Sequence, residues 1–179
     1  MYNPDTREIT TQRLILRPFH AEDAKRVSEL CNNINIYKST SSLPYPYPVE
    51  SALAWIQNHD ENFISDKSYE FAITDKLTGE IYGAIGLSNH KNNKNGEIGY
   101  WIGEDYWGKG YATEALRAIV DFAFSVKDYH KVWGRFFDSN PSSGKVMQKV
   151  GLVYEGLLKE HILKDGKYED LILYGLIKN

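Results

Sequence analysis

The stretch that decides the fold is YWGKGYATE, at Tyr106–Glu114. Its two glycines, Gly108 and Gly110, directly precede a segment from Tyr111 to Ala123 whose apolar residues recur at helical spacing. Glycine allows a tight turn, and the first turn of a helix leaves backbone N–H groups unpaired at the positive end of the helix dipole. The pattern therefore predicts an anion-binding loop at a helix N-terminus.

Two other interpretations of this loop are weaker. The glycines alone would also suit a plain turn that binds nothing. The spacing is neither G-x-x-x-x-G-K-[ST] nor G-x-G-x-x-G, so it does not favour an ATP-type or a dinucleotide site. The strand expected before the loop, Glu97–Ile102, belongs to an antiparallel meander and is not a first parallel strand, which separates the loop further from the dinucleotide pattern.

The hydrophobic period changes several times along the rest of the chain. The order of the expected elements, β-α-α-β-β-β-α-β-α-β-β, indicates a mixed α/β fold with an antiparallel meander before a strand–helix–strand crossover. Gly99 inside a strand suggests a bulge or a close backbone approach, and Asn32–Pro48 is expected to be a loop because of its prolines. The expected strands are Arg13–Arg17, Tyr69–Ile73, Ile81–Leu87, Glu97–Ile102, His130–Phe137, Leu152–Leu158 and Tyr168–Ile177, and the expected helices are Asp23–Cys31, Pro48–Asn62, Tyr111–Ala123 and Asn140–Val150.

Length and composition limit the class of protein. The 179 residues fit one domain, 1–179. A formal net charge of −3 provides no global basic field that would hold nucleic acid or an anionic membrane. No apolar run is long enough to span a bilayer, and no His, Cys, Asp or Glu cluster has metal-ligand spacing. We therefore expect no metal. The single cysteine, Cys31, cannot form an internal disulfide, so we expect a reduced, cytoplasmic protein.

Several ordered motifs across nearly the whole chain carry a family resemblance. They are TQRLILRPF at Thr11–Phe19, GEIGYWI, YWGKGYATEA, NPSSGKVMQKVGL at Asn140–Leu152, and the final YEGLLKEHILKDGKYEDLILYGL. With these motifs the sequence resembles the GNAT superfamily of N-acetyltransferases, and specifically its RimJ/RimL-like branch of ribosomal-protein N-terminal acetyltransferases. The resemblance implies the GNAT acyl-CoA N-acyltransferase fold, with a mixed central sheet, splayed strands and flanking helices, and acetyl-CoA as cosubstrate.

The resemblance also implies which residues hold the acetyl donor. The family's Q/R-x-x-G-x-G/A signature matches Trp107–Ala112, with Trp107 in place of Gln or Arg. The strand Glu97–Ile102 is expected to splay from Lys131–Phe137 so that pantetheine inserts between them. Asn140 matches an Asn whose amide contacts pantetheine, and it also suits the N-cap of the following helix. The expected coenzyme A contacts are Tyr100, Trp101, Ile102, Trp107, Gly108, Lys109, Gly110, Tyr111, Ala112, Thr113, Asn140, Ser143 and Lys145, with Lys149 as a further phosphate contact or a surface charge.

Two side chains are expected to carry the proton transfers. Ser143 matches the family's serine and would donate a hydrogen bond to the departing sulfur, and a nearby position that is often Tyr in the family is Met147 here. Glu97 is the expected base for the acceptor amine, unless it is a strand-edge charge that faces solvent. Glu160 and His161 are the alternative bases.

The resemblance implies direct transfer of the acetyl group to a primary amine. Cys31 and Ser143 have no adjacent His-carboxylate pair in the sequence, which disfavours an acyl-enzyme. The branch favours a protein N-terminal α-amine as acceptor, ahead of a polyamine or an aminoglycoside-type amine. A coenzyme A-binding sensor without turnover is the alternative from another class. The segment Tyr37–Pro48 is expected either to border the acceptor groove or simply to connect two elements, and both a monomer and a homodimer are compatible with the sequence.

Overall fold

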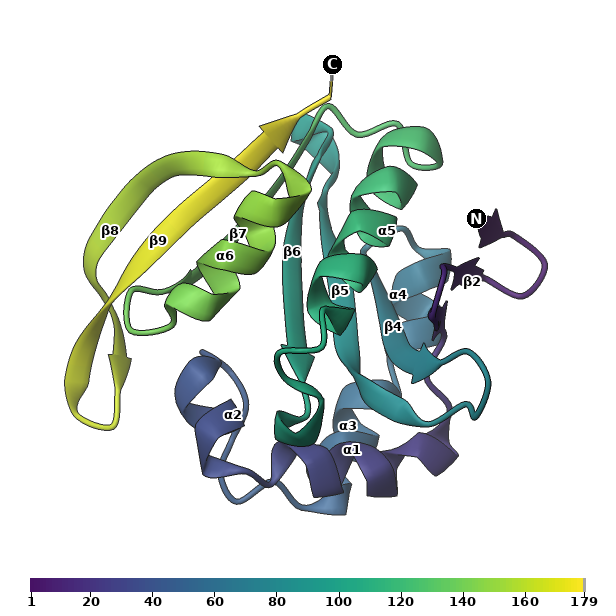
Figure 1. Ribbon diagram of the computed structural model, residues 1–179, viewed down its shortest axis with the longest axis horizontal. Helices are drawn as coiled ribbons and strands as arrows, with labels where there is room; N and C mark the ends of the chain where they lie inside the picture. The colour runs from purple at the N-terminus through teal and green to yellow at the C-terminus, as the bar shows by residue number, and fades with distance from the viewer. Residues whose placement is uncertain (179) are drawn as a thin grey trace.

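The computed structural model describes residues 1–178, apart from the side chain of Lys91; the last residue of the expected domain, Asn179, lies outside the described residues. Within them, nine strands form one mixed sheet in the order β1-β2-β3-β4-β5-β6-β7-β9-β8 (Figure 1). The strands are β1 Tyr2–Asn3, β2 Glu8–Thr10, β3 Leu14–Arg17, β4 Ser68–Asp75, β5 Ile81–His90, β6 Asn95–Ile102, β7 Lys131–Phe137, β8 Val153–Lys164 and β9 Lys167–Ile177.

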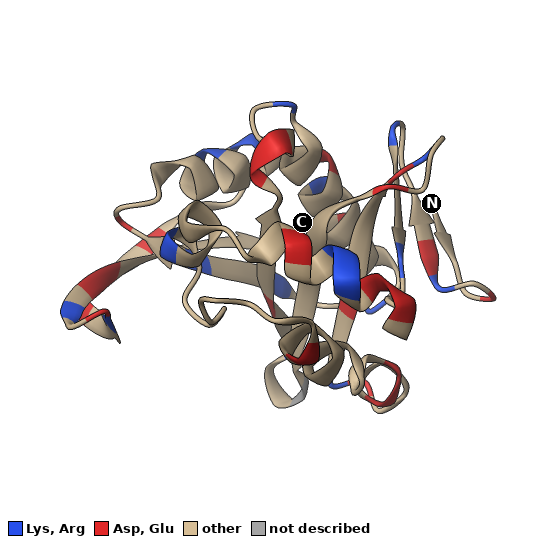
Figure 2. Cartoon of the chain, turned by 90° about the horizontal axis from the view of Figure 1, so that it is seen from below, with Lys and Arg blue, Asp and Glu red and all other residues tan. Residues whose placement is uncertain are grey.

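Helices cover both faces of the sheet. Figure 1 shows α5 and α6 side by side over one face, whereas α1 and α3 pack together at the other. Acidic and basic residues are interspersed along helices and strands (Figure 2). The helices are α1 Ala24–Cys31, α2 Ile34–Ser39, α3 Val49–Ile56, α4 His59–Ile64, α5 Tyr111–Ser125 and α6 Pro141–Val150.

The alternation of side chains along β5 explains the two layers. Ile85 and Leu87 are fully buried in the core cluster that includes Leu116 of α5, whereas Ala84 belongs to the cluster with Val27 of α1 and Trp101. Successive side chains of a strand point to opposite faces, so one strand supplies both cores. Each fully buried Leu or Ile contributes about 1.5–3 kcal/mol, which fixes α5 against the sheet.

The expected splay of two parallel strands is present. β6 pairs with β7 from Asn95–Lys131 only as far as Ile98–Gly134. Beyond that point Gly99–Ile102 stays paired with β5, while β7 continues its pairing with β9 as far as Phe137. The β5–β6 register is unbroken at Gly99, so the bulge expected there is wrong. The mixed α/β fold with splayed strands is confirmed.

Several local expectations are corrected. α2 begins inside the segment expected to be a loop, because Asn33 caps it by accepting hydrogen bonds from the amides of Asn35 and Ile36, and the first proline comes only at Pro44. The helix expected over 48–62 is two helices, α3 and α4. β8 runs to Lys164, well beyond the expected end at Leu158, and β1 and β2 were not expected.

Candidate active site

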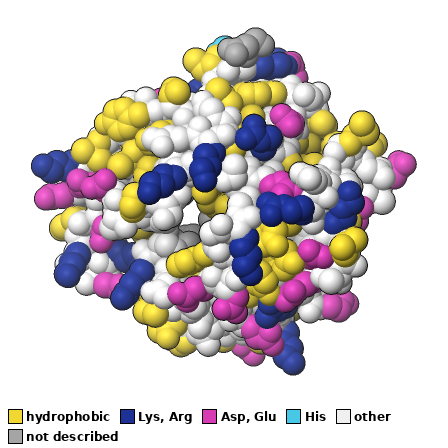
Figure 3. All heavy atoms as spheres, in the orientation of Figure 1, with side chains coloured by type: hydrophobic (Ala, Val, Ile, Leu, Met, Phe, Trp, Pro, Cys, Tyr) yellow, Lys and Arg dark blue, Asp and Glu magenta, His cyan; other side chains and the backbone are white. Residues whose placement is uncertain are grey.

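A cavity of about 780 Å³ lies at the point where β6 leaves β7. Figure 3 shows an opening in this face of the molecule with Lys and Arg side chains around it. The expected site residues that line the cavity are Glu97, Tyr100, Trp101, Ile102, Trp107, Gly108, Gly110, Tyr111, Ala112, Thr113, Asn140, Ser143 and Lys145, together with Lys149.

Another cavity, of about 810 Å³, lies between the N-terminal strands and α5. It is lined by Met1, Tyr2 and the outer side of α5, and it includes none of Glu97, Tyr100, Asn140 or Ser143. That cavity therefore contains none of the four groups that the sequence places at the reacting atoms, and the candidate site is the one between the splayed strands.

The glycine turn has the geometry of an anion site. Gly108 and Gly110 have φ values of +74° and +83°, in the left-handed region that favours glycine. The hydrogen bond from the Glu114 amide to the Gly110 carbonyl, 3.0 Å long, closes the first turn of α5. The amides of residues 111–113 precede it and have no partner within the helix. These amides and the helix dipole suit a bound phosphate.

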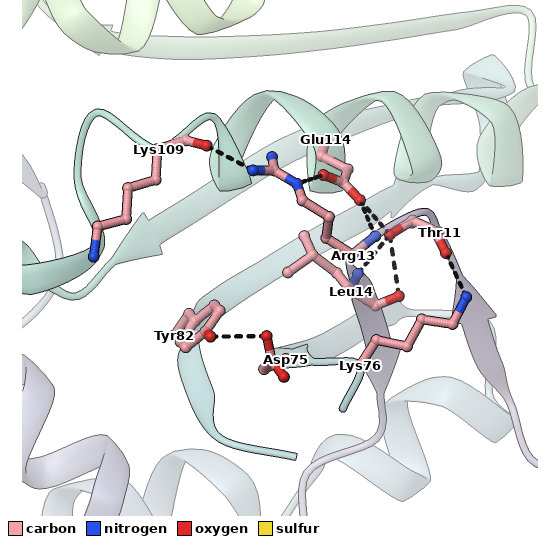
Figure 4. A network of polar contacts seen from close by, with 8 residues as sticks. All are labelled: Thr11, Arg13, Leu14, Asp75, Lys76, Tyr82, Lys109 and Glu114. Carbon is pink, nitrogen blue, oxygen red and sulfur yellow. Dashed lines mark hydrogen bonds and ion pairs between the residues drawn. The ribbon is translucent and has the colours of Figure 1, made fainter. Parts of the chain in front are cut away.

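An ion-pair network anchors this turn to the start of β3 (Figure 4). The Arg13 guanidinium donates to the Lys109 carbonyl at 3.0 Å and to the Glu114 carboxylate at 2.7 Å. That carboxylate also accepts from the Arg13 amide and the Thr11 hydroxyl, each at 2.7 Å. Burial alone would raise the pKa of Glu114, but these hydrogen bonds outweigh it and hold the pKa below its usual value. The sequence did not predict the pairing of Arg13 with Glu114, although Arg13 lies in the RLILR motif and Glu114 in the first turn of α5.

The Glu114 network predicts a pH-dependent stability. Glu114→Gln should lower the free energy of unfolding at pH 7 by about 2 kcal/mol, because it removes charge-assisted hydrogen bonds from a largely buried group. Since the folded-state pKa is depressed, this contribution is present above the unfolded pKa and is lost as the pH falls through the folded one. Urea unfolding at pH 7 and at successively lower pH values checks it; a difference between variant and wild type that does not shrink as the pH falls would contradict it.

Trp107 binds the end of strand β6. Its indole N–H donates to the Ile102 carbonyl at 2.6 Å, and 44% of the residue is exposed. The tryptophan thus replaces the family's Gln or Arg with a bond that joins the turn to the last residue of β6. Lys109, the expected contact that does not line the cavity, places its ammonium 5.5 Å from the centre of the Tyr106 ring.

A phenol and a hydroxyl meet beside the gap between the strands. The Tyr100 hydroxyl lies 2.8 Å from Ser143 Oγ and 3.0 Å from the Ser143 carbonyl oxygen. Burial raises the pKa of Tyr100 to about 12, and the hydrogen bond with Ser143 acts in the opposite direction. Met147, at the position where the family often has Tyr, is fully buried against Gly134. Sequence reasoning assigned Tyr100 a backbone role only, because nothing local places its side chain on α6.

Asn140 does not cap α6 with its side chain. Asn140 occupies the expected N-cap position, but its amide donates to the Ser39 carbonyl at 3.3 Å, so the side chain joins α2 to the cavity wall and makes no capping hydrogen bond. Lys145 and Lys149 are exposed on α6 at the rim of the cavity.

The three expected bases differ in their surroundings. The Glu97 carboxylate is paired with the Arg135 guanidinium at 2.8 Å. Glu160 and His161 are exposed on β8, where its register with β9 shifts, and neither lines the cavity. The structure therefore brings only Glu97 of the three to the site.

Other candidate chemistry is weak in the residues that the structure describes. Cys31 is buried, which raises the pKa of its thiol to about 12. Across 1–178 there is no group of three or more His, Cys, Asp or Glu residues that could hold a metal ion. None of the helices in this part of the chain is both long and apolar enough for a membrane span.

Comparisons with known proteins agree with this geometry. A family model described as an acetyltransferase (GNAT) domain matches residues 13–153. N-acetyltransferase p20 of Bacillus licheniformis is 28% identical over 169 residues, covering 94% of each chain. The [ribosomal protein uS5]-alanine N-acetyltransferase of Escherichia coli is 28% identical over 179 residues, covering 94% of this chain and 89% of that protein. A RimL ribosomal L7/L12 α-N-protein acetyltransferase solved with coenzyme A superposes with a TM-score of 0.88 at 21% identity, covering 95% and 97% of the two chains.

Because the family model spans most of the sequence, the chain belongs to the GNAT acetyltransferase family. It is an acetyl-CoA-dependent N-acetyltransferase, and the family expected from the sequence motifs is confirmed.

Proposed function

We propose that residues 1–179 act as one domain that transfers acetyl from acetyl-CoA directly to a protein N-terminal α-amine. The observation that carries this proposal is the end of β6–β7 pairing at Ile98–Gly134, directly before the glycine turn at the start of α5. A long thioester with an anionic end requires both features: an open strand edge for its arm and a cradle for its phosphates.

The structure fits this donor at both ends. The left-handed backbone at Gly108 and Gly110 leaves the helix amides accessible, and the pyrophosphate would lie on residues 108–113 with Lys145 and Lys149 at the rim. The arm would lie along Gly99–Ile102, where one free N–H stabilises the developing oxyanion and contributes about 3 kcal/mol. The proposed coenzyme A contacts remain those expected from the sequence, with Trp107 acting by holding the turn to β6.

Ser143 and Tyr100 would supply the proton for the leaving thiolate. Serine is too weak an acid to act alone, but here its hydroxyl lies 2.8 Å from a phenol. Both groups lie toward α6, because Tyr100 packs against the same core as Ile98 and Ile102. The sulfur would therefore be protonated from the α6 side of the sheet.

The other face of the sheet suits the acceptor. Glu97 and Arg135 lie on this face, since Ile98 and Phe136, their neighbours in sequence, point into the α5 core. The cavity here is also bordered by Ser39–Leu43 and Trp55, which supports the acceptor role expected for the Tyr37–Pro48 segment. Glu97 is the base expected from the sequence, although its charge is already offset by Arg135.

Direct transfer is favoured over an acyl-enzyme. Cys31 is the only cysteine of the chain, and it is buried with a pKa raised to about 12. Ser143 has Tyr100 as its side-chain partner, and among residues 1–178 no histidine lines the cavity to activate it as a nucleophile. An N-terminal α-amine suits such a site because its pKa of about 7.7–8.0 demands less help than the value near 10.4 of a lysine.

The acceptor class is tested by incubating the protein with acetyl-CoA and a panel of amines and then identifying products by mass spectrometry. The panel contains peptides beginning with alanine or serine, the same peptides with a blocked N-terminus and an internal lysine, a polyamine and an aminoglycoside. We expect acetylation of the free α-amines and at least tenfold less of the blocked peptides. Preferential acetylation of the polyamine or the aminoglycoside would contradict the assignment, and coenzyme A binding without any product would favour a sensor.

A further inference from the structure

A carboxylate that sequence reasoning passed over reaches the cavity from β4. Glu70 lies opposite Gly86 of β5, and Gly86 in turn lies opposite Gly99 of β6. The three residues form one row across the sheet, on the face away from α5, because Tyr69, Phe71 and Ile85 point into the α5 core. The row ends at the first residue of β6 that has no β7 partner.

The glycines in this row leave room for the Glu70 side chain. A Cβ built on Gly86 would lie 2.0 Å from Glu70 Oε2, so any larger residue at position 86 would displace the carboxylate. A Cβ on Gly99 would meet no atom within 4 Å, so the space beyond the carboxylate is open. Glu70, Gly86 and Gly99 all line the cavity. The carboxylate thus lies over the sheet and faces the gap in which the thioester arm is proposed to sit.

The surroundings of Glu70 differ from those of Glu97. Within residues 1–178 the structure contains no hydrogen bond or ion pair to the Glu70 carboxylate, whereas Glu97 is held by Arg135 at 2.8 Å. Burial raises the pKa of Glu70 to about 7. An unpaired carboxylate in this environment gains stability by taking up a proton near neutral pH, which is the behaviour required of a base for an α-amine.

We propose that Glu70 is the catalytic residue that accepts the proton of the acceptor ammonium. This assignment rests on the proposed function and replaces Glu97 in that role. The ammonium gives one proton to Glu70, and the freed nitrogen lone pair forms the C–N bond. The thioester carbonyl electrons move to oxygen, and their return breaks the C–S bond. The second nitrogen proton passes to solvent as the amide forms. The thiolate takes a proton from the Ser143–Tyr100 pair on the opposite side of the sheet, that pair is reprotonated from solvent, and Glu70 returns its proton to solvent.

Other charged groups face the same cavity and must be separated from Glu70 in a pH profile. His59 of α4 packs against Trp55 of the cavity wall, and burial lowers its pKa to about 4, so it is neutral in the relevant range. The titratable or charged groups that line the cavity besides Glu70 are Glu97, Tyr100, Tyr106, Tyr111, Arg135, Lys145 and Lys149.

The test compares Glu70→Gln with wild type in acetylation of an alanine-initiated peptide between pH 6 and pH 9. We expect kcat/KM to fall about 50-fold at pH 7, near the low end of general-base effects because an α-amine is partly neutral there. The difference should shrink below about fivefold at pH 9, where the amine needs no base. The affinity for coenzyme A should not change. Glu50→Gln, which alters an exposed glutamate in the first turn of α3 that does not line the cavity, is the matched control and should follow wild type.

The competing assignment is tested in parallel with Glu97→Gln. If Glu97→Gln removes the fall in kcat/KM toward low pH, and the pH profile of Glu70→Gln follows wild type, the proposal is overturned and the role returns to Glu97. If wild type acetylates no amine at any pH, the proposed function itself has failed and the assignment falls with it. An active wild type with an unaltered Glu70→Gln variant overturns the Glu70 assignment alone.

Thermal melting separates a catalytic from a structural role. Because the folded-state pKa of Glu70 is raised, its contribution to stability is present at low pH and is lost as the pH rises through about 7. Glu70→Gln should therefore melt no lower than wild type at pH 8. A large drop in melting temperature at pH 8 would show that the carboxylate holds the sheet together and would overturn the proposal.

Discussion

Replacement of Gly110 by tryptophan is expected to abolish coenzyme A binding, with a loss of more than about 100-fold in affinity. Gly110 has a φ of +83° and is the N-cap of α5, so a side chain there strains the backbone by about 1–2 kcal/mol. The larger part of the effect is steric and electrostatic, because the indole would cover the amides that are proposed to hold the pyrophosphate. Isothermal titration calorimetry with coenzyme A measures it.

The matched control is Gly151→Ala. Gly151 caps α6 with a φ of +100°, and a Cβ on it would meet no atom within 4 Å. This variant therefore introduces comparable backbone strain away from the cavity, and it should lose stability but keep its affinity for coenzyme A. Unaltered affinity in Gly110→Trp would refute the role of the turn, and an equal loss in Gly151→Ala would attribute the effect to general destabilisation.

Removal of either member of the Tyr100–Ser143 pair is expected to lower kcat by about 100-fold, within the usual range for general acid catalysis. Tyr100→Phe and Ser143→Ala should each leave the affinity for coenzyme A within about threefold of wild type. Because the two hydroxyls lie 2.8 Å apart and act as one relay, the double variant should be little worse than either single one. Single-turnover acetylation of an alanine-initiated peptide measures the chemical step directly.

Tyr174→Phe is the control for the phenol substitution. Tyr174 of β9 accepts a hydrogen bond at 2.8 Å through its hydroxyl from Gln148 of α6, the helix that also carries Ser143. Tyr174 does not line the cavity. Its removal should leave kcat unchanged. Losses that multiply in the Tyr100→Phe, Ser143→Ala double variant would show that the two groups act independently, and normal kcat in both single variants would remove them from the reaction.

The sequence predicted the parts of the site that depend on local signals. Glycines directly before a segment with helical apolar spacing are such a signal. The left-handed φ values observed at Gly108 and Gly110 agree with it. The prediction that β6 splays from β7 came from the family resemblance, because no local sequence pattern indicates where a strand stops pairing with its neighbour. α2 was missed because the prolines from Pro44 onward masked the Asn33 cap.

The groups that sequence reasoning missed depend on pairing between distant residues. Glu70 reaches the cavity only because β4, β5 and β6 align Glu70, Gly86 and Gly99, and a one-residue change of register would point it to the other face. Tyr100 meets Ser143 only because α6 packs over β7 beside the gap. Such placements follow from tertiary packing, which the spacing of residues along one segment does not encode.

Initial rates of thiol release, with acetyl-CoA and an alanine-initiated peptide varied together, test the central claim most directly. If the acetyl group passes directly between two substrates held in one cavity, the double-reciprocal lines must intersect and no thiol is released without the peptide. Parallel lines would indicate an acyl-enzyme and contradict direct transfer. Thiol release that does not depend on an amine, or none with any amine, would contradict the assignment of this cavity as an N-acetyltransferase site.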